Sequence, residues 1–188
     1  MLGYAFCASF CTLESSIRVL SEIKDMGEEI IPIMSENSVS CDTRFGKARD
    51  FVERIEKICG NKTVTSIVEA EKFGSIAPLD YLVISPCTGN TLAKLAAGIT
   101  DSAVTMAAKA HMRCDRPMLI ALATNDAMSQ NLKNIGALLS RKSVYFAPML
   151  QDDPEKKPHS LVARESLIKQ SLIAMKKGEQ IRPLFLEK

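Results

Sequence analysis

Six short apolar runs constrain the fold of this chain more than any other feature of its sequence. They lie at about residues 2–8, 28–34, 62–65, 80–85, 117–123 and 143–147. Amphipathic stretches fill most of the intervals, and this alternation is typical of βαβ units. The runs at 80–85 and 117–123 are apolar throughout, as expected for central strands of a parallel sheet that helices cover on both faces. The sequence therefore predicts a three-layer α/β fold around a doubly wound parallel sheet of about six strands.

Helix boundaries can be predicted at three places. The first helix is expected from near Thr12 to Met26, because four apolar residues recur there at helical spacing. The second places apolar side chains on one face and ends at Gly60, with Phe51, Ile55, Ile58 and Cys59 on that face. The last is expected at about 160–177, after a polar loop at about 148–159. This succession of elements is typical of a flavodoxin-like or Rossmann-like sheet.

The length and composition favour a single domain over residues 1–188. The net charge of +2 is spread over 24 basic and 22 acidic residues, so nucleic acid is not an expected partner. The six cysteines form no C-x-x-C pair and no histidine lies at metal-ligand spacing, so we expect no metal site. There is no secretory signal, and no apolar run approaches the ~18 residues of a membrane span. We therefore expect a cytoplasmic protein.

The run Ser85-Pro86-Cys87-Thr88-Gly89-Asn90-Thr91 is the clearest indication of a binding site. It follows an apolar segment and precedes a segment that is compatible with a helix. Such a turn leaves backbone N–H groups unpaired at the helix N-terminus, beside hydroxyl and amide side chains. This arrangement binds phosphate or the polar edge of a cofactor.

Other turns carry similar residues. Ser9 and Thr12 follow the first run and could hold a phosphate or simply cap a helix. After the fifth run, Asn125 could bond a flat heterocycle with Met128 packed on it, or the two could form an Asx-turn and fill the core. Arg44 could meet an anion or remain solvated. Because ligands of such sheets lie beyond the carboxyl ends of the strands, three polar turns on one edge favour a cofactor site.

The chain resembles the flavoprotein superfamily of FMN-binding cysteine decarboxylases and prenyl-FMN-type enzymes. The segment SPCTGNTLAKLAAGITDS is similar to that family's P-A-S-A-N-T-x-A-K-x-A-x-G-I-x-D block, with matches at Pro86, Asn90, Thr91, Ala93, Lys94, Ala96, Gly98, Ile99 and Asp101. Within the superfamily, nearly the whole chain is most similar to the dipicolinate synthase branch. Four segments carry this closer resemblance: DTRFG at 42–46, DSAVTMAAKA, ATNDA, and QDDP followed by KKP.

This resemblance implies an oxidoreductase subunit with FMN as cofactor. It implies oxidation of a dihydrodipicolinate-type precursor to dipicolinate in the mother cell of a spore-forming bacterium. The implied partner is the A subunit of dipicolinate synthase, which resembles a nicotinamide-dependent protein, so that NAD(P) enters only through it. A homo-oligomer is also implied.

The resemblance also assigns roles by position. Ser9 and Thr12 would lie near the FMN phosphate, and Ser35 near the phosphate or ribityl chain. The turn residues would line the flavin, namely Pro86, Thr88, Gly89, Asn90 and Thr91. Asn125 and Met128 match the family's P-x-M-N-x-x-M motif over the substrate. The substrate's two carboxylates could meet cations, for which the candidates are Arg44, Lys109, Arg113 and Lys157.

Departures from the family pattern keep two other functions open. The decarboxylases place a catalytic histidine after the second helix, whereas the histidines here, His111 and His159, lie elsewhere. The sequence therefore identifies no catalytic base. One alternative is a non-catalytic assembly protein that stabilises the A subunit without flavin, and the other is an FMN-dependent decarboxylase.

Overall fold

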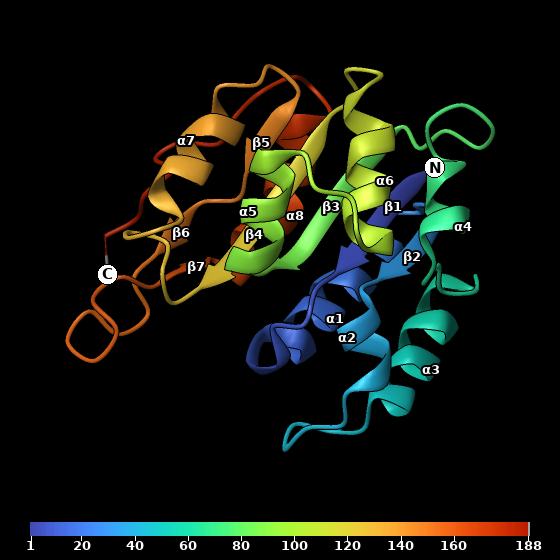
Figure 1. Cartoon of the computed structure of the whole chain (residues 1–188), viewed down its shortest axis with the longest axis horizontal. Coiled ribbons are helices and arrows are strands. Elements are labelled where there is room, and N and C mark those ends of the chain that lie inside the picture. The colour runs from blue at the N-terminus through green and yellow to red at the C-terminus, as the bar shows by residue number, and fades with distance from the viewer. Residues whose placement is uncertain (188) are drawn as a thin grey trace.

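The structure is a computed structural model in which residues 1–187 are described, and its centre is one mixed sheet of seven strands (Figure 1). The strands are β1 (Leu2–Phe6), β2 (Ile30–Met34), β3 (Tyr81–Cys87), β4 (Met118–Thr124), β5 (Val144–Phe146), β6 (Met149–Leu150) and β7 (Leu161–Ala163). Their order is β2-β1-β3-β4-β7-β6, and β5 also pairs with β4. The predicted α/β fold of flavodoxin type is confirmed.

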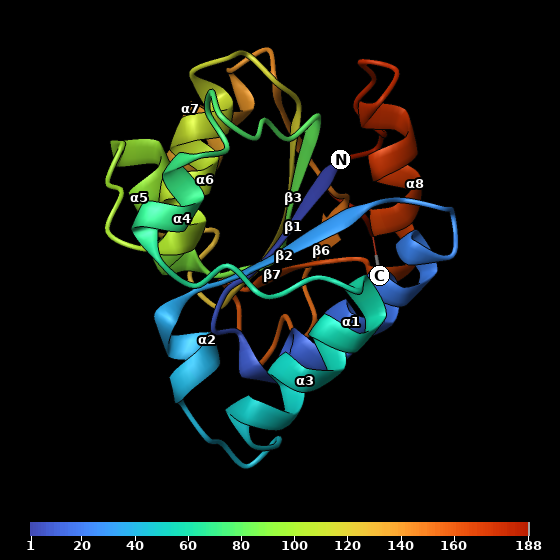
Figure 2. The same cartoon turned by 90° about the vertical axis from the view of Figure 1, so that its right-hand side faces the viewer.

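Helices cover both faces of the sheet (Figure 2). They are α1 (Phe10–Lys24), α2 (Glu36–Ser40), α3 (Ala48–Cys59), α4 (Ile67–Glu71), α5 (Gly89–Ala97), α6 (Ala103–Met112), α7 (Leu132–Leu139) and α8 (Glu165–Met175). The apolar faces of α1, α3 and α8 pack on one side of the sheet, against Tyr4, Phe6 and Val83. The helices α5, α6 and α7 pack on the other side, against residues such as Ile84 and Ile120. The alternation of strand residues between these two cores explains why the central strands are apolar throughout.

The predicted strand at 62–65 is wrong. Only Val64 reaches the sheet there, through an isolated parallel bridge to Ile33. Its N–H donates to Pro32 O and its carbonyl accepts from Met34 N. One apolar residue among polar neighbours gives an edge contact but no continuous strand, because too little side-chain surface is buried to hold a longer ladder.

The sheet is mixed rather than parallel, because the C-terminal region adds two short strands. β6 falls in the predicted loop at 148–159, and β7 occupies residues that were predicted to begin the last helix, which starts only at Glu165. β5 pairs with β4 at residues 118–120, so the end of β4 would be left unpaired. β7 completes it in antiparallel register, with Ala123 opposite Val162. The sheet is therefore mixed because the backbone groups at the end of β4 need hydrogen-bond partners.

The strands β1, β2, β3 and β4 are parallel, so their carboxyl ends meet at one edge of the sheet (Figure 1). The turns that lead into α1, α2 and α5 all begin at this edge. No helix in residues 1–187 combines the length and the apolar character needed to cross a bilayer. Within the same residues, no three His, Cys, Asp or Glu side chains are placed to hold a metal ion.

Candidate cofactor-binding site

A polar cavity of about 140 Å³ lies at the carboxyl ends of β1, β2 and β3. It brings together four of the residues predicted to bind the cofactor, namely Ser35, Thr88, Asn90 and Thr91. The rest of its lining is Ala8, Glu36, Asn37, Lys94, Asp101 and Ser102. Hydroxyl and amide groups dominate this surface, as the polar part of a nucleotide requires.

The start of α5 has a side-chain cap and a carboxylate beside it, whereas the amides of Gly89 and Asn90 have no acceptor among residues 1–187. Thr88 is extended, and its Oγ1 accepts a hydrogen bond of 3.2 Å from the N–H of Thr91, which caps the helix. Behind the turn, the Asp126 carboxylate accepts bonds from Thr124 Oγ1 at 2.5 Å and from Asn131 Nδ2 at 2.9 and 3.0 Å. The bond from Thr124 holds the pKa of Asp126 below its usual value. An ionised carboxylate therefore already lies beside this helix N-terminus.

Gly89 is required by that cluster. A Cβ atom at Gly89 would lie 2.4 Å from Thr124 Oγ1 and 2.7 Å from both Asn131 Nδ2 and Asp126 Oδ1. These distances are far below van der Waals contact, so no larger residue fits without moving the cluster. The predicted importance of Gly89 therefore has a steric reason, although its role in cofactor binding stays a prediction.

The start of α1 has no side-chain cap. Ser9 occupies the N-cap position, but its side chain accepts no hydrogen bond from a backbone N–H of the first turn. Instead Thr12 Oγ1 donates to Ser9 Oγ and O, at 2.8 and 3.1 Å. Among residues 1–187, the amides of Phe10 and Cys11 have no acceptor. Free amides at the start of a 15-residue helix fit an anion, so the residues present suit the phosphate of FMN here.

The wall between these two helix starts is formed by serine hydroxyls and by one ion pair. Ser35 Oγ lies 2.7 Å from Ser38 Oγ. Lys94 Nζ donates to Asp101 Oδ2 at 2.7 Å, and this pair fixes the turn after α5. The sequence reasoning assigned no site role to Lys94, Asp101 or Ser102. Lys94 and Asp101 belong to the sequence block that matches the family. That match could have been used to predict that they line the site.

Asn125 and Met128 lie at the same edge but outside the polar cavity. Asn125 is exposed beyond the end of β4. Met128 lines a separate, mostly apolar cavity of about 420 Å³, together with Met149, Leu150, Gln151, Pro154, Leu161 and residues 185–187. The C-terminal segment closes one side of that cavity, because Leu186 N donates to Met149 O at 2.8 Å.

The four candidate cations do not converge on one site. Arg44 is exposed and stacks on Phe45, with 4.9 Å from its guanidinium carbon to the ring centre. Lys157 forms a 2.7 Å ion pair with Asp152 in the loop between β6 and β7. Lys109 and Arg113 line a different cavity, at the C-terminal half of α6. Because α6 leads into the amino end of β4, these two cations lie away from the polar cavity.

The chain belongs to the Flavoprotein family, whose model matches residues 4–165. It is 40% identical to the B subunit of dipicolinate synthase from Bacillus subtilis (strain 168), over 99% of this chain and 93% of that protein. The crystal structure of the B subunit of dipicolinate synthase from Bacillus halodurans C superimposes with a TM-score of 0.91 and 36% identity. That match covers 100% of this chain and 96% of the other. Nearly the whole chain is thus similar to these two proteins.

A more distant structure shows the same fold. The FMN-dependent cysteine decarboxylase SpaF has a TM-score of 0.67 and 24% identity, over 93% of this chain and 96% of that chain. At this identity the likeness concerns the fold alone.

Proposed function

We propose that this chain is a single flavoprotein-like domain that serves as the FMN-binding B subunit of a dipicolinate synthase. With a nicotinamide-dependent A subunit, it would help oxidise a dihydrodipicolinate-type precursor to dipicolinate in the cytoplasm of the mother cell during sporulation. One observation carries the cofactor part of this proposal. Ser35, Thr88, Asn90 and Thr91 line one polar cavity, beside a long helix whose first amides have no acceptor in the described part of the chain. The similarity to two dipicolinate synthase B subunits supports the reaction.

The residues fall into two groups around the cofactor. The amides of Phe10 and Cys11, with the Ser9 and Thr12 hydroxyls, would hold the phosphate. Ser35, Asn90 and Thr91 would bond the ribityl hydroxyls from the cavity wall. When bound, FMN would supply the two-electron acceptor that aromatisation of a dihydropyridine requires.

The size of the cavity indicates where the flavin ring would lie. Pockets that enclose a cofactor usually measure about 300–1,000 Å³, whereas this one measures about 140 Å³. It would therefore enclose the ribityl chain, with the phosphate at the neighbouring start of α1, and leave the ring outside. A second copy of the chain could cover the ring, which supports a homo-oligomer with sites between protomers.

The substrate would bind near Met128. The 420 Å³ cavity there is mostly apolar and lies at the same sheet edge, so it suits the ring of a dihydropyridine. Asn125 lies exposed at the end of β4, where its amide could bond a substrate carboxylate. Lys157 is the candidate cation nearest in sequence to this cavity, and its Nζ is held by Asp152.

The second candidate function is a non-catalytic assembly protein without flavin, and the Glu36 side chain favours it. Glu36 lines the small polar cavity and, among residues 1–187, forms no ion pair. A carboxylate at this position disfavours an anionic cofactor beside it.

The test is reconstitution of the reaction. The chain would be mixed with the A subunit, NAD(P)⁺ and the dihydrodipicolinate-type precursor, and dipicolinate formation would be followed in the presence and absence of FMN. We expect the reaction to require both chains and FMN, and Asn90→Ala to slow it when FMN is limiting. Asn61→Ala, which removes the same side chain at the other end of the sheet, is the matched control. A reaction that needs the chain but ignores FMN and Asn90→Ala would replace the proposal with the assembly role.

A further inference from the structure

A cavity of about 470 Å³ lies at the amino ends of β4 and β5, at the edge of the sheet opposite to the polar cavity. Its volume falls in the range of about 300–1,000 Å³ that is usual for sites of small molecules. The turn between α6 and β4 forms one part of its wall, and the turn between α7 and β5 forms another. The polar residues that line it are Asp115, Arg141, Lys142, Ser143 and Tyr145.

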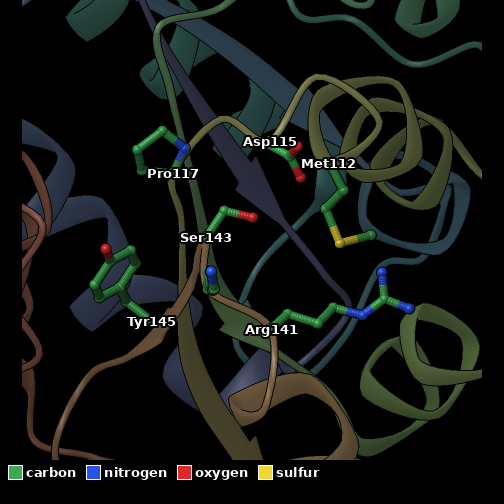
Figure 3. A pocket seen from close by; sticks show the side chains of 7 residues that line it. Met112, Asp115, Pro117, Arg141, Ser143 and Tyr145 are labelled. Atoms are coloured by element: carbon green, nitrogen blue, oxygen red, sulfur yellow. The ribbon is translucent and has the colours of Figure 1, made fainter.

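The pairing of the two strands holds these turns side by side. β4 and β5 are parallel, and Met118 N donates a hydrogen bond of 2.8 Å to Ser143 O where they begin. Asp115 and Arg141 lie at equivalent positions, each three residues before the first residue of its strand. Figure 3 shows their side chains on opposite sides of the cavity. A negative and a positive group therefore face one space from two walls.

The polar side chains of this cavity have no partners in the protein. Among residues 1–187, none of the five forms an ion pair or a side-chain hydrogen bond. Neighbouring side chains that do not line the cavity behave differently. Cys114 Sγ donates to Gly74 O at 3.4 Å, and Arg116 Nη1 donates to Leu79 O at 3.4 Å. The groups that face the cavity therefore keep their bonding capacity for a ligand.

Asp115 occupies a position that disfavours it in two ways. Its φ of 52° lies in the left-handed region, where it is the only residue other than glycine among residues 1–187. Its carboxylate also follows the C-terminus of α6, where the helix dipole disfavours a negative charge. Unfavourable residues of this kind are found mainly at functional sites. A positive group of a ligand would compensate the charge.

The rest of the cavity wall is apolar. Figure 3 shows Pro117 and the ring of Tyr145 on one side of the space and Met112 on the other. These surfaces gain free energy when an apolar group covers them and displaces water. A ligand that fits this cavity therefore has a negative group, a positive group and an apolar part.

We propose that the cavity before β4 and β5 binds an α-amino acid with an apolar side chain. The Asp115 carboxylate accepts hydrogen bonds from the ammonium group, and Arg141 donates to the carboxylate. The apolar side chain packs against Met112 and the Tyr145 ring. Because the site lies at the opposite edge of the sheet from the polar cavity, it does not depend on the proposed function.

A ligand-detected NMR titration of the full chain tests the proposal with four probes. L-Phenylalanine has all three parts, 2-phenylethylamine lacks the carboxylate, 3-phenylpropionate lacks the ammonium group, and glycine lacks the apolar side chain. We expect phenylalanine to bind at least about tenfold more tightly than each of the other three, because each loses a charged pair or the apolar contact.

Two variants assign the charges. Asp115→Asn should weaken phenylalanine binding by about tenfold or more and should not weaken binding of 3-phenylpropionate, which has no ammonium group. Arg141→Gln should likewise weaken phenylalanine binding and spare 2-phenylethylamine. Asp25→Asn is the matched control, because Asp25 follows the C-terminus of α1 and does not line the cavity. It should leave all four affinities unchanged.

Loss of binding through misfolding is distinguished by thermal unfolding. Asp115→Asn removes the charge that the dipole of α6 disfavours, so its melting temperature should rise by about 1–3 °C. The proposal is overturned if phenylalanine does not bind, or if an analogue that lacks one charge binds as tightly as phenylalanine. It is also overturned if either Asp115→Asn or Arg141→Gln binds phenylalanine as tightly as the parent.

Discussion

The starts of α1 and α5 lie at the same edge of the sheet, yet they differ in the side chains that surround their first amides. Thr88 caps α5, and the Asp126 carboxylate packs behind its first residue. Ser9 leaves α1 without a side-chain cap, and two of its amides lack an acceptor in residues 1–187. In both helices the first two amides have no acceptor within residues 1–187. The comparison teaches that the more recognisable sequence motif marks the start that already has a side-chain cap and a carboxylate beside it. The less distinctive turn is the better place for an anion, because it lacks a side-chain cap and its first turn contains no acidic residue.

Among these changes, the substitution Gly89→Ala should disturb the start of α5 most. A Cβ atom would meet Thr124, Asp126 and Asn131 at 2.4–2.7 Å, so the free energy of unfolding should fall by about 3 kcal/mol. Urea denaturation measures this. Gly136→Ala in α7 is the matched control, because a Cβ there meets nothing within 4 Å. That change should raise stability by about 0.5 kcal/mol. Equal effects of the two substitutions would show that the cluster does not hold Gly89 closely.

Asp126→Asn tests the charge behind α5. It weakens the bonds from Thr124 and Asn131, so we expect a loss of about 1–2 kcal/mol at pH 7. Because the pKa of Asp126 is lowered in the folded protein, its stabilisation is complete above its unfolded pKa of about 3.9 and is lost as pH falls through the folded value. Unfolding followed from pH 7 to pH 3 should therefore show a smaller difference between parent and variant at low pH. A difference independent of pH would exclude the carboxylate as its source.

Thr88→Ala and Ser9→Ala compare the two N-cap positions directly. Removing the Thr88 hydroxyl deletes a cap and should cost about 1 kcal/mol. Removing the Ser9 hydroxyl deletes no cap, so the free energy of unfolding should change by less than about 0.5 kcal/mol. Thermal and urea unfolding of both variants measure the difference. If Ser9→Ala destabilised the protein as much as Thr88→Ala, the Ser9 side chain would act as a cap of α1.

The helices and strands that could be predicted are those whose own residues show an apolar run or a helical periodicity. The runs that form β1 to β5 could be predicted from the sequence. Most of them have five or more consecutive apolar residues or a turn beside them. β6 and β7 have two and three residues, which carry no readable periodicity, and they form because the end of β4 needs a partner. Such a need appears only after the fold is known.

Some residues of the candidate site could likewise be predicted from the sequence, and others could not. Ser35, Thr88, Asn90 and Thr91 were predictable together, because they follow parallel strands whose carboxyl ends share an edge. Ser102 was not, since it reaches the cavity only through the return of the chain after α5. Lys109 lies on α6 and Arg113 follows its last residue, and both are exposed. Their distance from the polar cavity depends on the direction in which α6 runs. No local sequence pattern predicts the direction of a helix in the fold.

The central claim is that the uncapped start of α1 binds the phosphate of a flavin nucleotide. Its most direct test is a visible absorbance titration of the purified chain with FMN and, separately, with riboflavin, which lacks the phosphate. We predict that both flavins show perturbed bands and that FMN binds at least about tenfold more tightly, as expected for charge-assisted bonds to one phosphate. Equal affinity for riboflavin and FMN, or a spectrum that neither flavin perturbs, would contradict the claim.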